Sequence, residues 1–169
     1  MAMTERRRSD AARQPLPPEA LALDRQLCFA VYSAAHAFTR TYKPLLDPFG
    51  LTYPQYLVLL ALWEEDGRTV KALGTTLGLD SGTLSPLLKR LEASGYIDRA
   101  RDRSDERQVL VTLTDKGRAM QAEASGIRLE IGTASGCPPR TLEELNAALQ
   151  RLTENLRAGA AEEERADLR

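Results

Sequence analysis

The sequence is poor in the residue types and segments that would identify a metal-binding, membrane or secreted protein directly. Its 169 residues include 2 cysteines, 1 tryptophan and 1 histidine, and no group of candidate ligands has the spacing of a zinc site. No stretch is long and apolar enough to cross a membrane, and the N-terminus lacks the apolar core of a signal peptide. We therefore expect a cytoplasmic protein that needs no metal or other cofactor.

The sequence also lacks an excess of basic residues. The 23 Lys and Arg are balanced by 24 Asp and Glu, and the resulting net charge of −1 counts against nucleic-acid binding as an average over the chain. Acidic residues gather at 161–169 and near Glu143 and Glu144, away from the charged run at 102–107. In a reducing compartment the two cysteines argue against a permanent disulfide and leave a transient one open.

Length and composition fit one domain. Hydrophobic residues make up 43% of the chain and charged residues 28%, as in ordinary globular proteins. Residues 1–18 carry Arg and Pro without periodicity, and we expect a disordered arm there, with Arg6–Arg8 solvated. Residues 19–158 form the predicted domain, and 159–169 an acidic, frayed tail.

The centre of the chain predicts a winged helix-turn-helix. A short helix at 69–77 is stopped by Gly78, and Asp80 or Ser81 can cap a second helix that ends near residue 95. In the second helix four leucines share one stripe: Leu84, Leu87, Leu88 and Leu91. Segments 96–101 and 108–113 then read as a hairpin around a charged tip, because Val109, Val111 and Leu113 alternate with other residues.

Helices are expected on both sides of this unit. We predict helices at 19–42, ended by Pro44 and Pro48, at 55–65 and at 114–134. In the helix at 55–65, Leu57, Leu60, Ala61 and Trp63 are expected to be mostly interior. A breaker-rich loop at 132–139 and a capping box at Thr141 lead into a last helix, frayed beyond Leu156. The predicted DNA-binding lobe is 54–117, and segments 19–48 and 118–158 are predicted to pair two copies.

The residues carry a family resemblance. The run LGLDSGTLSPLLKRLEASGYI at 77–97, the DER at 105–107 and the LTDKG at 113–117 resemble the MarR-type transcription factors. Within that family the chain is similar to the organic hydroperoxide resistance regulators (OhrR), over roughly residues 20–158. The resemblance implies a mainly α fold with a small β-hairpin wing, a homodimer joined through its terminal helices, and binding to double-stranded operator DNA.

Two groups of residues are candidates for DNA contact. Polar and cationic residues off the leucine stripe of the second helix suit the major groove: Ser81, Thr83, Ser85, Lys89 and Arg90. In the wing, Arg103 and Arg107 suit the backbone or minor groove, and Asp105 is expected to hold Arg107 through a bidentate pair. Arg99 and Arg101 alternate with Asp98 and Asp102, so a self-neutralised ribbon is the alternative there.

Cys28 lies in an apolar helical segment, where a cysteine is most often a core residue. The resemblance implies a reactive thiol instead, with Tyr42 and Tyr53 donating to its thiolate and Tyr32 one turn away on the same face. On a continuous helix Cys28 and Tyr42 lie about 21 Å apart, at roughly 1.5 Å per residue. Each sensor site would therefore be shared between protomers. His36 reads as a packing or surface residue.

Cys137 lies between Gly136 and two prolines, and the resemblance implies that it closes a disulfide with an oxidised Cys28 of the other subunit. The sequence therefore predicts a repressor, not an enzyme, that releases its operator when organic hydroperoxide oxidises Cys28. One alternative is a MarR-type repressor gated by a small aromatic ligand. Another is a thiol peroxidase, although no Cys-x-x-Cys motif is present.

Overall fold

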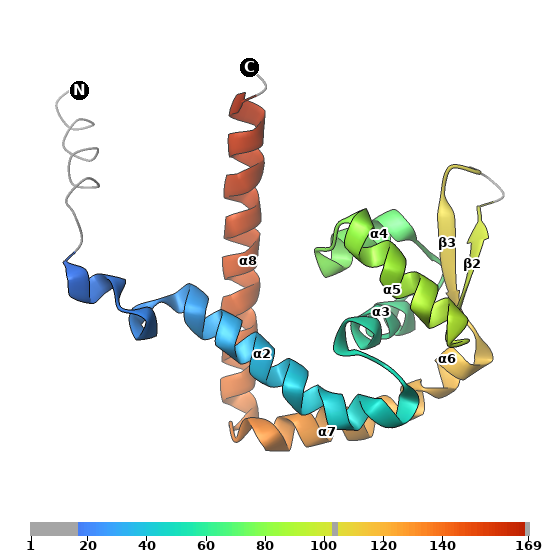
Figure 1. Ribbon diagram of the computed structural model, residues 1–169, viewed down its shortest axis with the longest axis horizontal. Coiled ribbons are helices and arrows are strands. Elements are labelled where there is room, and N and C mark those ends of the chain that lie inside the picture. The colour runs from blue at the N-terminus through green and yellow to red at the C-terminus, as the bar shows by residue number, and fades with distance from the viewer. Residues whose placement is uncertain (1–16, 103–104, 168–169) are drawn as a thin grey trace. The chain divides into compact units, whose positions relative to one another are not determined.

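The computed structural model describes residues 17–102 and 105–167, so most of the predicted N-terminal arm lies outside the described part. The chain divides into two units, residues 1–41 and 42–169, which are described separately. The first unit holds two 3-10 helices, η1 (Pro18–Leu21) and η2 (Leu23–Arg25), and most of helix α2 (Leu27–Leu46), coloured blue in Figure 1. Within the helices that the structure describes, none combines the length and apolar character needed to cross a membrane.

Helix α2 is shifted along the chain from the predicted 19–42. The residues before it form 3-10 turns, and the Gln26 side chain bonds the carbonyl oxygens of Ala20 and Ala22 at 2.8 and 3.2 Å. Pro44 does not end the helix, which continues to Leu46. Leu46 is fully buried, and this burial offsets the backbone hydrogen bond that Pro44 cannot make. The turn comes instead at η3 (Asp47–Phe49), closed by Gly50 with a φ of 65°.

Helix α3 (Tyr53–Glu64) is the central helix of the second unit. Gln55 accepts from the backbone N–H of Thr52 at 2.8 Å, so the polar Gln55 side chain is satisfied although it is buried. Of the four residues expected to be interior, only Ala61 is fully buried. Leu57, Leu60 and Trp63 are half-buried, whereas the core takes Tyr56, Val58, Leu59, Ala61 and Leu62.

The predicted helix-turn-helix is confirmed as α4 (Val70–Leu77) and α5 (Ser81–Ala93). Thr69 caps α4 by accepting from the N–H of Ala72 at 3.1 Å, and Gly78 ends it with a φ of 65°. The leucine stripe of α5 faces inward, since Leu84, Leu88 and Leu91 are fully buried. Burial of this apolar stripe fixes α5 against the rest of the lobe.

The wing belongs to a three-stranded antiparallel sheet with the order β1-β3-β2. Strands β2 (Ile97–Arg101) and β3 (Val109–Leu113) are the predicted hairpin, paired from Ile97 opposite Leu113 to Arg101 opposite Val109. The third strand, β1 (Arg68–Thr69), which pairs with β3, was not predicted from the sequence. Two residues are too few for a period-2 pattern, so only pairing with a distant strand defines β1.

Four predictions for the C-terminal third were wrong. The expected helix at 114–134 is two helices, α6 (Asp115–Ala119) and α7 (Gln121–Ser135), and the expected loop at 132–139 is only the link at 136–138. Helix α8 begins at Pro139, where proline favours a first turn, so Thr141 lies inside it and forms no capping box. Finally, α8 continues to Asp167, because the alanine and glutamate of the predicted tail are strong helix formers.

Candidate nucleic-acid interface and sensor residues

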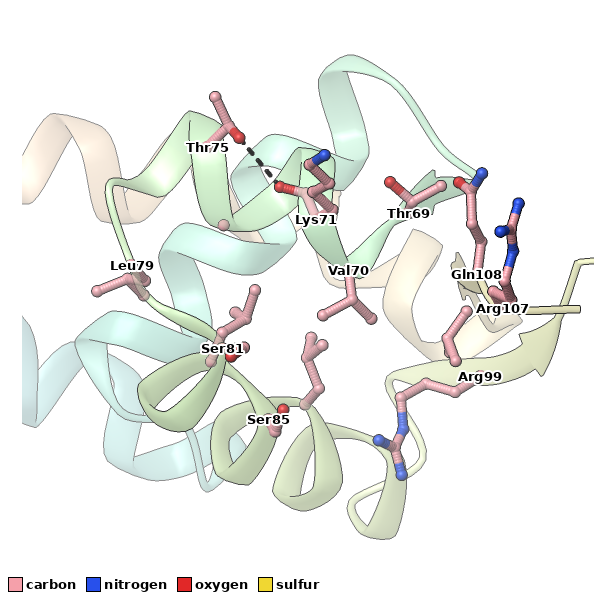
Figure 2. Close-up of a pocket in the computed structure, with 14 residues that line it drawn as sticks. Thr69, Val70, Lys71, Thr75, Leu79, Ser81, Ser85, Arg99, Arg107 and Gln108 are labelled. Carbon is pink, nitrogen blue, oxygen red and sulfur yellow. Dashed lines mark hydrogen bonds between the residues drawn. The ribbon is translucent and has the colours of Figure 1, made fainter. Parts of the chain in front are cut away.

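A hollow of about 880 Å³, lined by both apolar and polar side chains, opens between α4, α5 and the wing. Figure 2 shows Ser81 and Ser85 of α5 on one side of it and Lys71 and Thr75 of α4 on the other, with wing residues closing the third side. Side chains at its rim supply hydroxyl groups and cations, the groups that bind phosphates and base edges. The rim of the hollow therefore carries the kinds of group that contact nucleic acid.

The start of α5 is fixed by Asp80. Its carboxylate accepts from the backbone N–H of Thr83 at 3.0 Å and from the Thr83 hydroxyl at 2.8 Å, and these hydrogen bonds lower the pKa of Asp80. The Thr83 hydroxyl is thus already engaged as a donor. Thr83, Lys89 and Arg90 are exposed but do not line the hollow, whereas Ser81 and Ser85 do.

The expected pair between Asp105 and Arg107 is present in the wing. The Arg107 guanidinium donates twice to the Asp105 carboxylate, at 3.0 and 3.3 Å, and its backbone N–H donates at 3.2 Å. The hydrogen bonds from Arg107, followed by that from Gln108, lower the pKa of Asp105. The Arg107 side chain is 90% exposed, so its charge is oriented yet open to solvent. Arg103 lies outside the described residues.

Arg99 does not sit in a self-neutralised ribbon. Its guanidinium donates to the Glu92 carboxylate of α5, with Nε 3.0 Å from Oε2, and this hydrogen bond lowers the pKa of Glu92. Only 23% of the Arg99 side chain is exposed. The pair ties the end of α5 to β2, since Glu92 and Arg99 are seven residues apart in sequence, and Arg99 also lines the hollow.

Several lining residues were not singled out from sequence: Thr69, Lys71, Thr75 and Gln108. Lys71 and Thr75 are four residues apart on α4, and the Thr75 hydroxyl donates to the Lys71 carbonyl at 3.1 Å, the dashed bond in Figure 2. Their i, i+4 spacing was the available signal, because it places both on one helix face. The helix before the turn thus contributes to the same polar surface as α5.

The cysteines are both free thiols, and their settings differ. Cys28 is exposed on α2, not sealed in a core. Cys137 is half-buried in the short link between α7 and α8, where its backbone N–H donates to the Ser135 hydroxyl oxygen at 3.3 Å. The link is a tight turn and not the broad loop expected from sequence. Cys137 lines a hollow of about 730 Å³ together with Leu129 and Leu142.

Two of the three predicted sensor tyrosines are brought together. Tyr42 stacks on Tyr53 with ring centroids 4.3 Å apart, and Tyr56, which sequence analysis missed, lies 5.8 Å from Tyr42. Tyr32 belongs to the other unit and contacts His36 at 4.3 Å. Burial, reinforced by Tyr53 and Tyr56, raises the pKa of Tyr42 to about 12, so its phenol keeps its proton further into the alkaline range than a free tyrosine does.

This pKa gives a pH dependence of stability. The pKa of Tyr42 is raised from 10.0 to about 12, so the unfolded chain loses its phenolic proton first. The contribution of Tyr42 is complete below pH 10 and is lost as the pH rises towards 12. We expect the free energy of unfolding to fall across this window, and to fall less steeply in Tyr42→Phe. Urea unfolding at several pH values checks this, and identical slopes in both proteins would contradict it.

A capped helix-turn-helix, a β-hairpin wing and an open cationic surface define a winged-helix transcriptional regulator. The family description "Transcriptional regulator SarA/Rot" matches residues 40–123. The HTH-type transcriptional regulator TtmR of Methylorubrum extorquens (strain PA1) is 56% identical over 145 residues, covering 83% of this chain and 73% of that protein. The organic hydroperoxide resistance transcriptional regulator of Bacillus subtilis (strain 168) is 47% identical over 134 residues, covering 79% and 91%. The chain belongs to the SarA/MarR-type winged-helix family of transcriptional regulators.

Solved structures agree with this assignment. Reduced AbfR bound to DNA is similar to this chain with a TM-score of 0.68 and 41% identity, covering 82% of this chain and 95% of that one. Disulfide-formed AbfR is similar with a TM-score of 0.57 and 44% identity, covering 80% and 96%. The predicted fold class, mainly helical with a small wing, is therefore confirmed.

Proposed function

We propose that the protein is a homodimeric, redox-sensing repressor that releases its operator when an organic hydroperoxide oxidises Cys28. The observation that carries the proposal is the exposed thiol of Cys28 in a chain that also holds a cluster of neutral tyrosine phenols. Its 47% identity to a regulator named for organic hydroperoxide resistance supports the same inducer.

Pairing of two copies is supported by exposed apolar side chains on the terminal helices. On α2 these are Leu27, Phe29, Val31, Tyr32 and Phe38, and on α8 they are Leu145, Leu149 and Leu156. A monomer would leave this surface in water, whereas a second copy would cover it. In a pair with antiparallel α2 helices, each Cys28 would lie near the tyrosine cluster of the partner.

Operator binding is assigned to the hollow and the wing. Ser81, Ser85 and Lys89 of α5 would read base edges, and Arg107 would enter the minor groove or contact phosphate. The pairing of Arg107 with Asp105 supports this role, because it orients an exposed guanidinium before DNA arrives. A two-fold dimer would present two such surfaces to a palindromic operator.

Arg107→Ala is expected to weaken operator binding about tenfold, and to reduce the slope of log affinity against log salt by about 1 if Arg107 contacts phosphate. Fluorescence anisotropy with a labelled operator at several salt concentrations measures both. Arg140→Ala is the matched control, since it removes the same charge from α8, where Arg140 pairs with Glu144 at 3.0 Å. Equal losses in the two variants would mean that Arg107 acts only through net charge.

The chemistry of release follows from thiolate reactivity. The Cys28 thiolate attacks the terminal oxygen of the hydroperoxide, the O–O bond breaks, and the alkoxide leaves as an alcohol after taking a proton. Neutral phenols favour this step because they donate to the anionic sulfur. The Cys28 sulfenic acid then condenses with the thiol of the partner subunit's Cys137, which forms a disulfide and expels water. The closed disulfide would shift the terminal helices and change the spacing of the two wings.

A non-reducing gel run beside an operator shift tests this chemistry. With cumene hydroperoxide the wild type is expected to give a covalent dimer that dithiothreitol reverses, while Cys28→Ser and Cys137→Ser give none. A covalent dimer in Cys28→Ser would assign the oxidisable thiol wrongly. Release by an aromatic ligand under excess reductant, without any covalent dimer, would favour a ligand-gated regulator instead.

A further inference from the structure

Helix α3 carries the tyrosine cluster at its N-terminal end. Tyr53 begins the helix and stacks on Tyr42, and Tyr56 lies less than one turn further on with its ring 5.8 Å from that of Tyr42. The Tyr56 ring then meets the Trp63 ring edge-on, with centroids 5.9 Å apart. The aromatic contacts therefore run without a gap from Tyr42 to the last turn of α3.

The C-terminal end of α3 is fastened to the base of the wing. The Trp63 indole Nε1–H donates to the carbonyl oxygen of Gly117 at 2.9 Å, across 54 residues of sequence. Just beyond α3, Asp66 accepts from the backbone N–H of Leu113 at 2.8 Å and from the Arg118 guanidinium at 3.0 Å. These bonds hold both the end of β3 and the start of α6.

The attachment point has no freedom to move alone. A side chain on Gly117 would place its Cβ 2.1 Å from the carbonyl oxygen of Tyr96, so Gly117 lies directly against the start of the other wing strand. The Thr114 N–H also donates to that same Tyr96 oxygen, at 3.1 Å. Gly117 is therefore packed against the start of β2 and linked through Thr114 to the end of β3.

We propose that Trp63 is a positioning residue that couples the tyrosine cluster to the wing, with α3 as the connecting element. Rearrangement around Tyr42 would shift the Tyr56 and Trp63 rings and, through the indole hydrogen bond, the base of the wing. The event that would trigger this rearrangement, oxidation of Cys28, rests on the proposed function. The coupling itself needs no oxidant and can be measured in reduced protein.

The test is a double-mutant cycle on operator affinity in reduced, full-length protein. Tyr42→Leu removes the ring contacts of the cluster, and it is expected to weaken operator binding about fivefold or more. Trp63→Phe keeps a ring but loses the indole donor. In this background Tyr42→Leu is expected to weaken operator binding less than about twofold. Equal costs in both backgrounds would overturn the proposal.

The matched control is Tyr96→Phe, which also removes an aromatic donor to a distant backbone oxygen. The Tyr96 hydroxyl donates to the carbonyl of Phe49 at 2.7 Å, outside the aromatic series. In this background Tyr42→Leu is expected to keep its full cost. If Tyr42→Leu no longer weakens operator binding in this background either, a general destabilisation of the lobe, and not Trp63, explains the result. That outcome would overturn the proposal.

A second measurement needs no change at Trp63, should that variant fold poorly. The chain has 1 tryptophan, so its indole N–H gives a single, assigned NMR resonance. Tyr42→Leu is expected to shift that resonance, and Tyr96→Phe is not; an unmoved resonance in Tyr42→Leu would overturn the coupling.

Repeating the operator-binding measurements in the presence of peroxide separates the coupling from the proposed redox function. If the wild type keeps its operator under peroxide while the cycle is non-additive, the redox function fails and the coupling stands.

Discussion

Cys28→Ser protein is expected to stay on its operator at hydroperoxide concentrations that weaken wild-type binding about 100-fold. Serine is nearly the same size as cysteine, so the exposed position on α2 tolerates it, but its hydroxyl does not react with hydroperoxides. Reduced Cys28→Ser should therefore bind the operator as the wild type does. Fluorescence anisotropy with and without cumene hydroperoxide measures the difference.

Cys137→Ser is the informative companion to this variant. It retains the attacking thiol but loses the partner that would trap the sulfenic acid. We expect exposure to peroxide to drive its Cys28 towards sulfinic acid, which dithiothreitol does not reverse, and mass spectrometry of the Cys28 peptide follows this. If peroxide releases the Cys28→Ser variant from its operator, in contrast, Cys28 is not the sensor, and the protein is a DNA-binding dimer without this redox function.

Gly117→Ala is expected to lower the free energy of unfolding by about 3 kcal/mol or more, and to abolish operator binding. The added Cβ would lie 2.1 Å from the Tyr96 carbonyl oxygen and 3.1 Å from the Leu113 side chain. A backbone atom cannot rotate away as a flexible side chain can, so the wing must separate from α6. Urea unfolding gives the stability, and anisotropy gives operator binding.

Gly126→Ala is the matched control for this effect. Gly126 lies inside α7, and a Cβ there would meet nothing within 4 Å. Alanine should raise the free energy of unfolding by about 0.5–1 kcal/mol, because glycine loses more conformational freedom in a helix. Similar losses of stability in both variants would show that Gly117 has no special steric role.

These two predictions concern different parts of the switch. In the proposed function Cys28 detects the oxidant, and its loss should leave the DNA-binding lobe intact. Gly117 decides whether the wing is held, and its substitution should remove DNA binding in either redox state. Trp63 connects Gly117 to the tyrosine cluster, because its indole donates to Gly117 while its ring contacts Tyr56. Only a change at Trp63 is expected to spare both ends and weaken their coupling.

The sequence by itself determined the winged helix-turn-helix, because its signals are local. Thr69 and Asp80 cap the two helices within three residues of the N–H groups they accept from, and Gly78 ends the first helix. The leucine stripe of α5 and the alternation in β3 are likewise readable over one element. The pair of Asp105 with Arg107 spans two residues, and it too was predicted correctly.

Tertiary structure alone decided the contacts between distant segments. Strand β1 exists only through its pairing with β3, and Arg99 pairs with Glu92 because β2 folds back against α5. Tyr56 joins the tyrosine cluster, and Trp63 bonds Gly117 across 54 residues. No local pattern encodes such partners, since they depend on how whole elements pack. The helices and the wing of the DNA-binding lobe could thus be foreseen from sequence, whereas the contacts that hold them together could not.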